Sequence, residues 1–180
     1  SEASGVGQVV QVEDSEVSGS YIYAASQHAG GVVSTWNTVR RTTVSDTTVS
    51  AGRYAGGVGA GYTSVQDCTV SNSVITGTSY IGGALGTSYN STINSTGVVD
   101  SQVGSDVSSY VGGLVGGNYQ DSSTQCFAYI YNSFSKDTEV KASTAAGGII
   151  GYARGGNYQE NYSNATVIAR ENAGGFAGLA

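Results

Sequence analysis

The chain has 180 residues, of which 28 are Gly and none is Pro or Met. Its formal net charge at pH 7 is −6, and its seven Lys and Arg residues are scattered apart from the adjacent Arg40 and Arg41, so there is no basic stripe to bind nucleic-acid phosphates. No apolar run approaches the roughly 18 residues of a membrane span, so we expect neither nucleic-acid binding nor membrane insertion.

Pairs of glycines recur along the chain at intervals of 26 to 35 residues. They stand at Gly30-Gly31, Gly56-Gly57, Gly82-Gly83, Gly112-Gly113, Gly147-Gly148 and Gly174-Gly175. Such a period is typical of stacked supersecondary units, which have no linker between them. We therefore expect one repeat domain over residues 1–180, with units that end near residues 34, 60, 86, 116, 151 and 178.

A second element is an Asp or Asn that has apolar residues two positions before it and three after it in most units. Its copies centre on Asp14, Asp46, Asn72, Asp100, Asp137 and Asn164, and a further apolar column runs through Val39, Val65, Ile93 and Ile130. These stretches alternate with period two and are rich in Val, Ile, Thr and Tyr, which is typical of short strands. No window has the apolar spacing of an amphipathic helix. We predict an all-β fold, a right-handed parallel β-helix (β-solenoid) of about six coils with three short strands per coil.

In such a coil the recurring residue types have structural roles. Asp and Asn tolerate the left-handed backbone conformation, so we expect one corner to carry a ladder of Asp46, Asn72, Asp100, Asp137 and Asn164. The glycine pairs suit a corner or bulge that needs positive φ, or a place where neighbouring coils leave no room for a side chain. A phosphate cradle would need a strand that leads into a helix, and we expect no helix.

Three of the glycine-pair segments resemble the GLUG repeat of bacterial surface proteins. They are Ile81-Gly-Gly-Ala-Leu-Gly86, Val111-Gly-Gly-Leu-Val-Gly116 and Ala146-Gly-Gly-Ile-Ile-Gly151. The segment Asp67-Cys-Thr-Val-Ser-Asn-Ser-Val74 also looks like the stretch that precedes the glycine pair in these repeats, whereas Ser34 and Ala60 replace the last Gly in the first two units. The resemblance implies a secreted or wall-attached protein, similar to adhesins or to the repeat regions of immunoglobulin A peptidases, built as a parallel β-helix.

A column of aromatic residues is the main candidate for ligand binding. Tyr54, Tyr80 and Tyr110 stand two residues before the glycine pairs, and His28 and Asn172 take this position near the ends. Since side chains alternate across a strand, these rings should face outward as a flat strip that suits a sugar or a protein partner. Alternatively, the rings only stabilise neighbouring strands.

A repeated loop is the second candidate binding surface. Asn118-Tyr119-Gln-Asp121 and Asn157-Tyr158-Gln-Glu160 each follow two glycines, which indicates a matching protrusion on adjacent coils.

Residues suited to catalysis or to metal binding are sparse. His28 is the single histidine, which is too few for a nucleophilic triad or a zinc site. Asp137 and Glu139 should share one side of a strand, but the neighbouring lysines favour a solvated charge cluster over an acid–base pair. A disulfide between Cys68 and Cys126 stays open, because two coils separate them unless the insertion around Cys126 folds back. We expect no enzymatic activity, no cofactor and no metal.

Three functional hypotheses follow from the pattern. The first is an extracellular adhesin or stalk module, on a bacterial surface or secreted, that presents a rigid face to a host or matrix protein or glycan. The second is a fibre subunit that self-associates through its coil ends, because no capping unit follows the last glycine pair. The same observation suits a piece of a longer array. The third, an ice-binding or polysaccharide-acting β-helix, would need a flat threonine array or an acidic cleft.

Overall fold

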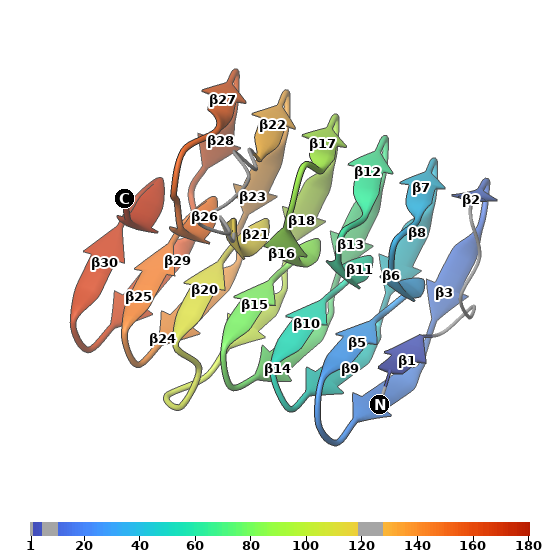
Figure 1. Ribbon diagram of the computed structural model, residues 1–180, viewed down its shortest axis with the longest axis horizontal. Coiled ribbons are helices and arrows are strands. Elements are labelled where there is room, and N and C mark those ends of the chain that lie inside the picture. Colours follow the sequence, from blue (N-terminus) through green and yellow to red (C-terminus); the bar gives the residue numbers. More distant parts are fainter. Residues whose placement is uncertain (1, 5–10, 119–127) are drawn as a thin grey trace.

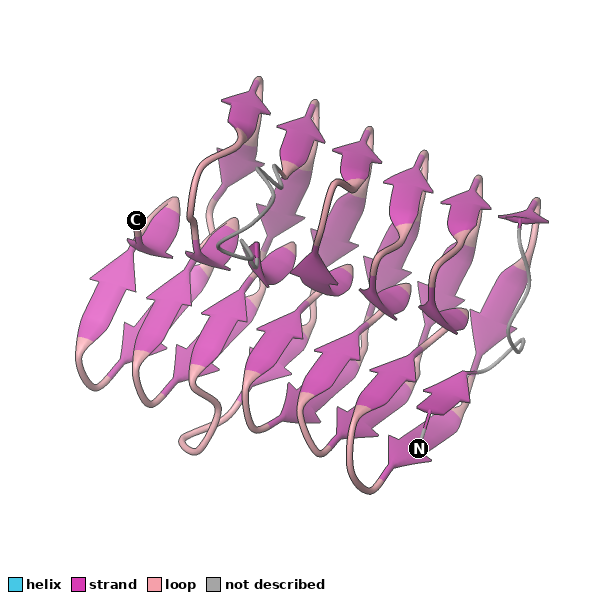
Figure 2. Cartoon of the chain, viewed as in Figure 1, coloured by secondary structure: helices cyan, strands magenta, loops and turns pink. Residues whose placement is uncertain are grey.

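The computed structural model describes residues 2–4, 11–118 and 128–180, and the regular elements of this part of the chain are 31 strands with no helix (Figures 1 and 2). The strands form five parallel sheets that wind into a β-solenoid of about six turns. The predicted fold class is therefore confirmed, but three strands per coil is wrong, since each turn has about five. The described residues include no apolar helix long enough to cross a membrane.

Three of the sheets arise from steps of five residues, each of which points one apolar side chain inward, as at the fully buried Val39, Val44 and Val49. Sheet B contains β2 (Gln11–Glu13), β7 (Thr38–Arg40), β12 (Ser64–Gln66), β17 (Thr92–Asn94), β22 (Tyr129–Tyr131) and β27 (Asn157–Gln159). Sheet C contains β3 (Glu16–Ser18), β8 (Thr43–Ser45), β13 (Thr69–Ser71), β18 (Gly97–Val99), β23 (Phe134–Lys136) and β28 (Tyr162–Ser163). Sheet D contains β4 (Tyr21–Ala24), β9 (Thr48–Ala51), β14 (Val74–Gly77), β19 (Gln102–Gly104), β24 (Glu139–Ala142) and β29 (Thr166–Ala169).

The corner between sheets C and D is the predicted Asx ladder. Its φ angles are 51° at Asp46, 47° at Asn72, 47° at Asp100 and 50° at Asp137, so the left-handed conformation is confirmed at these four positions. Asn164 does not have positive φ; its side chain instead donates to Asp137 Oδ1 at 2.9 Å.

Asp14 is not a member of this ladder. In the register of sheet C, Ser18 pairs with Ser45, so the residue equivalent to Asp46 in the first unit is Gly19, with φ 57°. Asp14 turns the preceding corner, between sheets B and C. The sequence pattern therefore assigns Asp14 to the wrong corner, five residues before the correct position, because both corners share the same local pattern.

Small hydroxyl residues complete both corners. Thr47 follows Asp46, and its Oγ1 donates to the carbonyl oxygen of Ser45 at 2.7 Å. Thr42 makes the same contact with Arg40 at 2.8 Å on the other corner. Both threonines are 1 % exposed. Each buried hydroxyl group therefore has a hydrogen-bond acceptor, and each of these corner carbonyls has a donor inside the coil.

The other two sheets, A and E, flank the glycine pairs and were not among the three strands predicted for each coil. Sheet A contains β1 (Glu2–Ser4), β5 (His28–Gly30), β10 (Tyr54–Gly56), β15 (Tyr80–Gly82), β20 (Tyr110–Gly112), β25 (Ala145–Gly147) and β30 (Asn172–Gly174). Sheet E contains β6 (Val33–Thr35), β11 (Gly59–Gly61), β16 (Leu85–Ser88), β21 (Val115–Asn118), β26 (Ile150–Tyr152) and β31 (Ala177–Leu179). Each glycine pair thus joins two strands that fold back on one another as an arch.

Close backbone approach explains the glycines of the pair. A Cβ at Gly56 would lie 1.9 Å from the carbonyl oxygen of Gly59, across the arch, and a Cβ at Gly83 would lie 2.1 Å from that of Gly113, in the next turn. Neither glycine has positive φ. Lack of room for a side chain is therefore confirmed as the reason for the pair, and the need for positive φ is not.

Candidate aromatic binding site

The predicted aromatic column is a continuous row of stacked rings, which we call the tyrosine ladder: His28, Tyr54, Tyr80 and Tyr110. These residues begin β5, β10, β15 and β20 and pair in register. Ring centroids lie 4.8 Å apart for His28 and Tyr54, 5.7 Å for Tyr54 and Tyr80, and 5.0 Å for Tyr80 and Tyr110, with interplanar angles of 14°, 13° and 24°. The column then changes, because Ala145 follows Tyr110 and Asn172 follows Ala145.

The rings of the ladder lie on the outer side of the coil as predicted, since the neighbouring Ala55, Ile81 and Val111 are fully buried, but they are half-buried and do not form a fully exposed strip. Its rings cover the open end of the arch: a Cβ at Gly117, in sheet E, would lie 2.8 Å from Tyr80 Cδ1. Tyr152, also in sheet E, contacts the ring of Tyr110 at 5.2 Å with a tilt of 38°. The tyrosines therefore both stabilise the arch and leave part of each ring accessible.

A second row of rings, which sequence reasoning missed, follows the strands of sheet E. Trp36 stacks on Tyr62 at 4.2 Å and 9°, and Tyr62 contacts Tyr89 at 5.1 Å and 47°. Trp36 is 71 % exposed. A usable signal was present, because Trp36 and Tyr62 each stand six residues after the first glycine of a pair.

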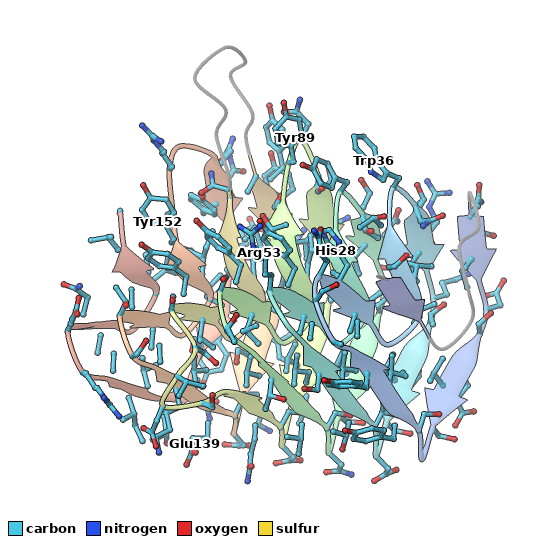
Figure 3. The ribbon with its side chains drawn as sticks, turned by 60° about the horizontal axis from the view of Figure 1, so that its bottom comes forward. His28, Trp36, Arg53, Tyr89, Glu139 and Tyr152 are labelled. Atoms are coloured by element: carbon cyan, nitrogen blue, oxygen red, sulfur yellow. The ribbon has the colours of Figure 1, made fainter. Side chains whose placement is uncertain are left out.

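A groove of about 400 Å³ separates the two rows over the first turns of the solenoid. It is lined by Gln27, His28, Arg53, Tyr54, Tyr62, Thr87 and Tyr89. Figure 3 shows Trp36 and Tyr89 along one side, with His28 and Arg53 along the other. The guanidinium of Arg53 lies 5.1 Å from the ring centroid of Tyr54, a cation–π distance that orients the charge over the ladder.

The second candidate surface, the repeated Asn-Tyr-Gln loop, is not a repeated structure. Asn118 ends β21 in sheet E, whereas Asn157 begins β27 in sheet B, so the two segments occupy different sides of the coil. Asn118 is fully buried, and its Nδ2 donates to the carbonyl oxygen of Arg154 at 3.0 Å, which is a structural role. Asn157 is exposed, and Tyr119 lies outside the described residues.

The side chain of Tyr158 is fixed by contacts within the chain. Its hydroxyl donates to the carbonyl oxygen of Gly155 at 2.7 Å, and its ring meets Phe176 edge-on at 5.7 Å. Burial raises the pKa of Tyr158 to about 12, because the ionised phenolate would be poorly solvated there.

The acidic residues singled out in the sequence do not converge. Asp137 lies at the corner before β24, not on the strand with Glu139 as expected. Its carboxylate lies 3.7 Å from Lys136 Nζ, and Lys141 pairs with Asp106 at 3.1 Å. Among residues 2–4, 11–118 and 128–180, no three His, Cys, Asp or Glu side chains are grouped to hold a metal ion.

Glu13, Asp14 and Arg41 form an exposed ion cluster near the first turn. Arg41 Nε lies 2.6 Å from Asp14 Oδ1, and its Nη2 lies 2.8 Å from Glu13 Oε2. A hydrogen bond from Gln11, then one from Arg41, holds the pKa of Glu13 below its usual value, and the bond from Arg41 does the same for the pKa of Asp14. The arginine thus neutralises these carboxylates, and they do not form an open cation site.

Cys68 lies inside the corner between sheets B and C, in the position that Thr42 has one turn earlier. Its thiol is free and 1 % exposed, and Sγ donates to the carbonyl oxygen of Gln66 at 3.2 Å. Burial raises the pKa of this thiol. Cys126, its suggested disulfide partner, lies outside the described residues.

Comparisons with protein-family models, with curated proteins and with solved structures found no match. The resemblance to the GLUG repeat therefore stays a prediction that rests on the quoted segments. What the chain itself supplies is the double row of rings and the groove between them.

Proposed function

We propose that the chain is a non-catalytic extracellular module, an adhesin or stalk segment of a bacterial surface, that binds a glycan of a host or matrix through its aromatic face. The observation that carries the proposal is the tyrosine ladder, whose four rings each lie within 5.7 Å of the next, centroid to centroid, across four successive turns. Flat rings offer large contact area to the apolar faces of sugars, with polar tips for hydroxyl groups.

Rigidity supports this function. Each turn is bonded to the next through backbone hydrogen bonds, such as Gly57 N to Gly83 O at 3.0 Å and Gly83 N to Gly112 O at 3.2 Å. A surface that is already ordered loses little conformational entropy when it binds, so even modest contacts translate into affinity. A repeat of rings also allows several sugar units of one chain to bind together.

The test is a binding screen of the 180-residue chain on glycan and matrix-protein arrays, followed by the variant Tyr80→Leu. Leucine keeps apolar bulk over Gly117 but removes the flat ring. The matched control is Tyr21→Leu, since Tyr21 is 74 % exposed on β4 of sheet D, away from the ladder. Circular dichroism and melting temperature establish that each variant is folded.

We expect Tyr80→Leu to weaken binding to the best array ligand about tenfold or more, and Tyr21→Leu to leave it unchanged. Equal binding by both variants would contradict a role for the ladder. Scattering from the same samples across a concentration series tests the fibre hypothesis, because particles that lengthen with concentration would favour end-to-end assembly over a side-on binding face.

A further inference from the structure

We infer that the groove between the tyrosine ladder and the Trp36 row binds an acidic glycan, with a sugar carboxylate held by Arg53. This inference rests on the proposed function and names the chemical class of its ligand. It depends on three properties of the groove: its unneutralised arginine, its two aromatic walls and the conformation of the residues that form the second wall.

Arg53 is the cation of the groove. Arg40, Arg41, Lys136 and Lys141 all lie within 4.0 Å of a carboxylate. Within the described part of the chain Arg53, Arg154 and Arg170 make no ion pair, and of these three only Arg53 lines the groove. Its side chain is exposed beside the ring of Tyr54. A guanidinium in this setting presents a planar fork of donors that matches a carboxylate.

None of the residues that line the groove is an Asp or a Glu. The carboxylates whose side chains are described lie on sheets B, C and D, at their corners, or on the connections from sheet D to sheet A. Asp106, on one of these connections, pairs with Lys141. Glu2 begins the same column as the ladder but lies in β1, two strands from β10. Since the whole chain has a net charge of −6, a preference for an acidic ligand would have to arise locally at Arg53.

The second wall is built at a conformational cost. Trp36 and Tyr62 have φ angles of 61° and 52°, a region that bulky residues rarely adopt because Cβ crowds the backbone there. Most other corners of the solenoid place Asp, Asn or Gly in this conformation, as at Asp46 and Gly19, and the exceptions Arg41, Ser95 and Glu160 are not aromatic. Strained residues that persist in a fold often belong to a functional surface, and here Tyr62 lines the groove while Trp36 stacks on its ring.

The size and lining of the groove suit sugars. A volume of about 400 Å³ lies within the usual range of small-ligand sites, about 300–1,000 Å³. Rings of Tyr54, Tyr62 and Tyr89 supply flat faces, while Gln27, Thr87 and Arg53 add polar groups between them. This combination suits a pyranose ring, with one apolar face and a rim of oxygens, better than a uniformly apolar ligand.

The test uses two probes with the same sugar rings: tetragalacturonic acid and its fully methyl-esterified form. Binding to the 180-residue chain is measured by calorimetry or by fluorescence of Trp36, its single tryptophan. We expect the acid to bind at least tenfold more tightly than the ester. Arg53→Gln should bind both forms equally, at the affinity of the ester, because a hydrogen-bonded ion pair is lost.

The control for charge is Arg170→Gln, which removes an exposed arginine between β29 and β30, and it should leave both affinities unchanged. A further variant, Trp36→Asn, tests the second wall without disturbing the fold. Asparagine tolerates positive φ, so the substitution removes the indole ring and leaves the backbone conformation unstrained. Followed by calorimetry, this variant should melt within a few degrees of the parent chain and bind both probes about tenfold more weakly.

The outcomes separate the two proposals. Loss of binding in Tyr80→Leu, with equal affinity for acid and ester in the parent chain, would overturn the acidic-glycan inference and leave the proposed function intact. Loss of the acid preference in Arg53→Gln supports the inference. Binding of tetraglutamate as tightly as tetragalacturonate would overturn it as well, because charge alone would then explain recognition.

Discussion

Substitution of the second glycine of a pair should test how closely the turns are stacked. In the native backbone, a Cβ at Gly83 would lie 2.1 Å from the carbonyl oxygen of Gly113 and 2.8 Å from Val98 Cγ1. At Gly175, the equivalent position of the last turn, a Cβ would meet nothing within 4 Å. The two sites have the same chemistry and differ in whether neighbouring atoms lie against the added Cβ.

Gly83→Ala must push neighbouring turns apart at the arch. Overpacking costs about 1–3 kcal/mol, and the two backbone bonds made by Gly83, to Gly57 and to Gly112, contribute about 0.5–1.5 kcal/mol each. We therefore expect a loss of about 2–6 kcal/mol in the free energy of unfolding. Gly175→Ala should be neutral or stabilise by up to about 1 kcal/mol, since it reduces the entropy of the unfolded chain.

Urea unfolding followed by circular dichroism measures both variants, with the slope of the transition compared with that of the parent chain. If Gly83→Ala and Gly175→Ala were equally stable to within about 0.5 kcal/mol, the glycine pair would not be a packing requirement. The account of the arch would then be wrong.

Three further substitutions test other parts of the coil. Thr47→Val should destabilise the chain by about 1–3 kcal/mol in urea titrations, because it removes a buried hydroxyl that donates to the carbonyl of Ser45 and accepts from the backbone N–H of Ser20. The neighbouring Thr48→Val, on the half-buried outer side, should change stability by less than about 0.5 kcal/mol, and equal effects would refute the internal role of the hydroxyl. Asp100→Val should cost about 1–2 kcal/mol where Asp100→Asn costs almost nothing, since asparagine tolerates φ 47° and valine does not; equal melting temperatures would refute this. In a Cys126→Ser background, Cys68 should react with a thiol reagent only when the chain unfolds, and rapid labelling of the folded protein would contradict its burial. Because the pKa of Cys68 is raised in the folded chain, its contribution to the free energy of unfolding should be complete below the usual thiol pKa of about 8.5 and should fall as pH rises above that value.

The architecture could be predicted from the sequence, because in a solenoid each strand residue pairs with the residue one repeat later in the chain. The five-residue spacing of Val39, Val44 and Val49 lays out three sheets directly, and Asp46, Asn72 and Asp100 mark the corner between two of them. Sheets A and E were not counted among the predicted strands of a coil because segments such as Gly59–Gly61 contain residues with low intrinsic strand propensity. Neighbouring turns impose the extended conformation on them.

The candidate site also has one part that could be predicted from the sequence and one part that could not. The tyrosine ladder was predictable, because Tyr54, Tyr80 and Tyr110 keep a constant distance from their glycine pairs, whereas Tyr89 is displaced by one position from the spacing of Trp36 and Tyr62 and so hides the second row. The sequence by itself determined which residues stack within a column, because the period sets the register of parallel strands. Only the tertiary structure decided that two columns face each other across a groove, because that depends on the arch, where backbone contacts between glycines bring the start of sheet A beside the end of sheet E.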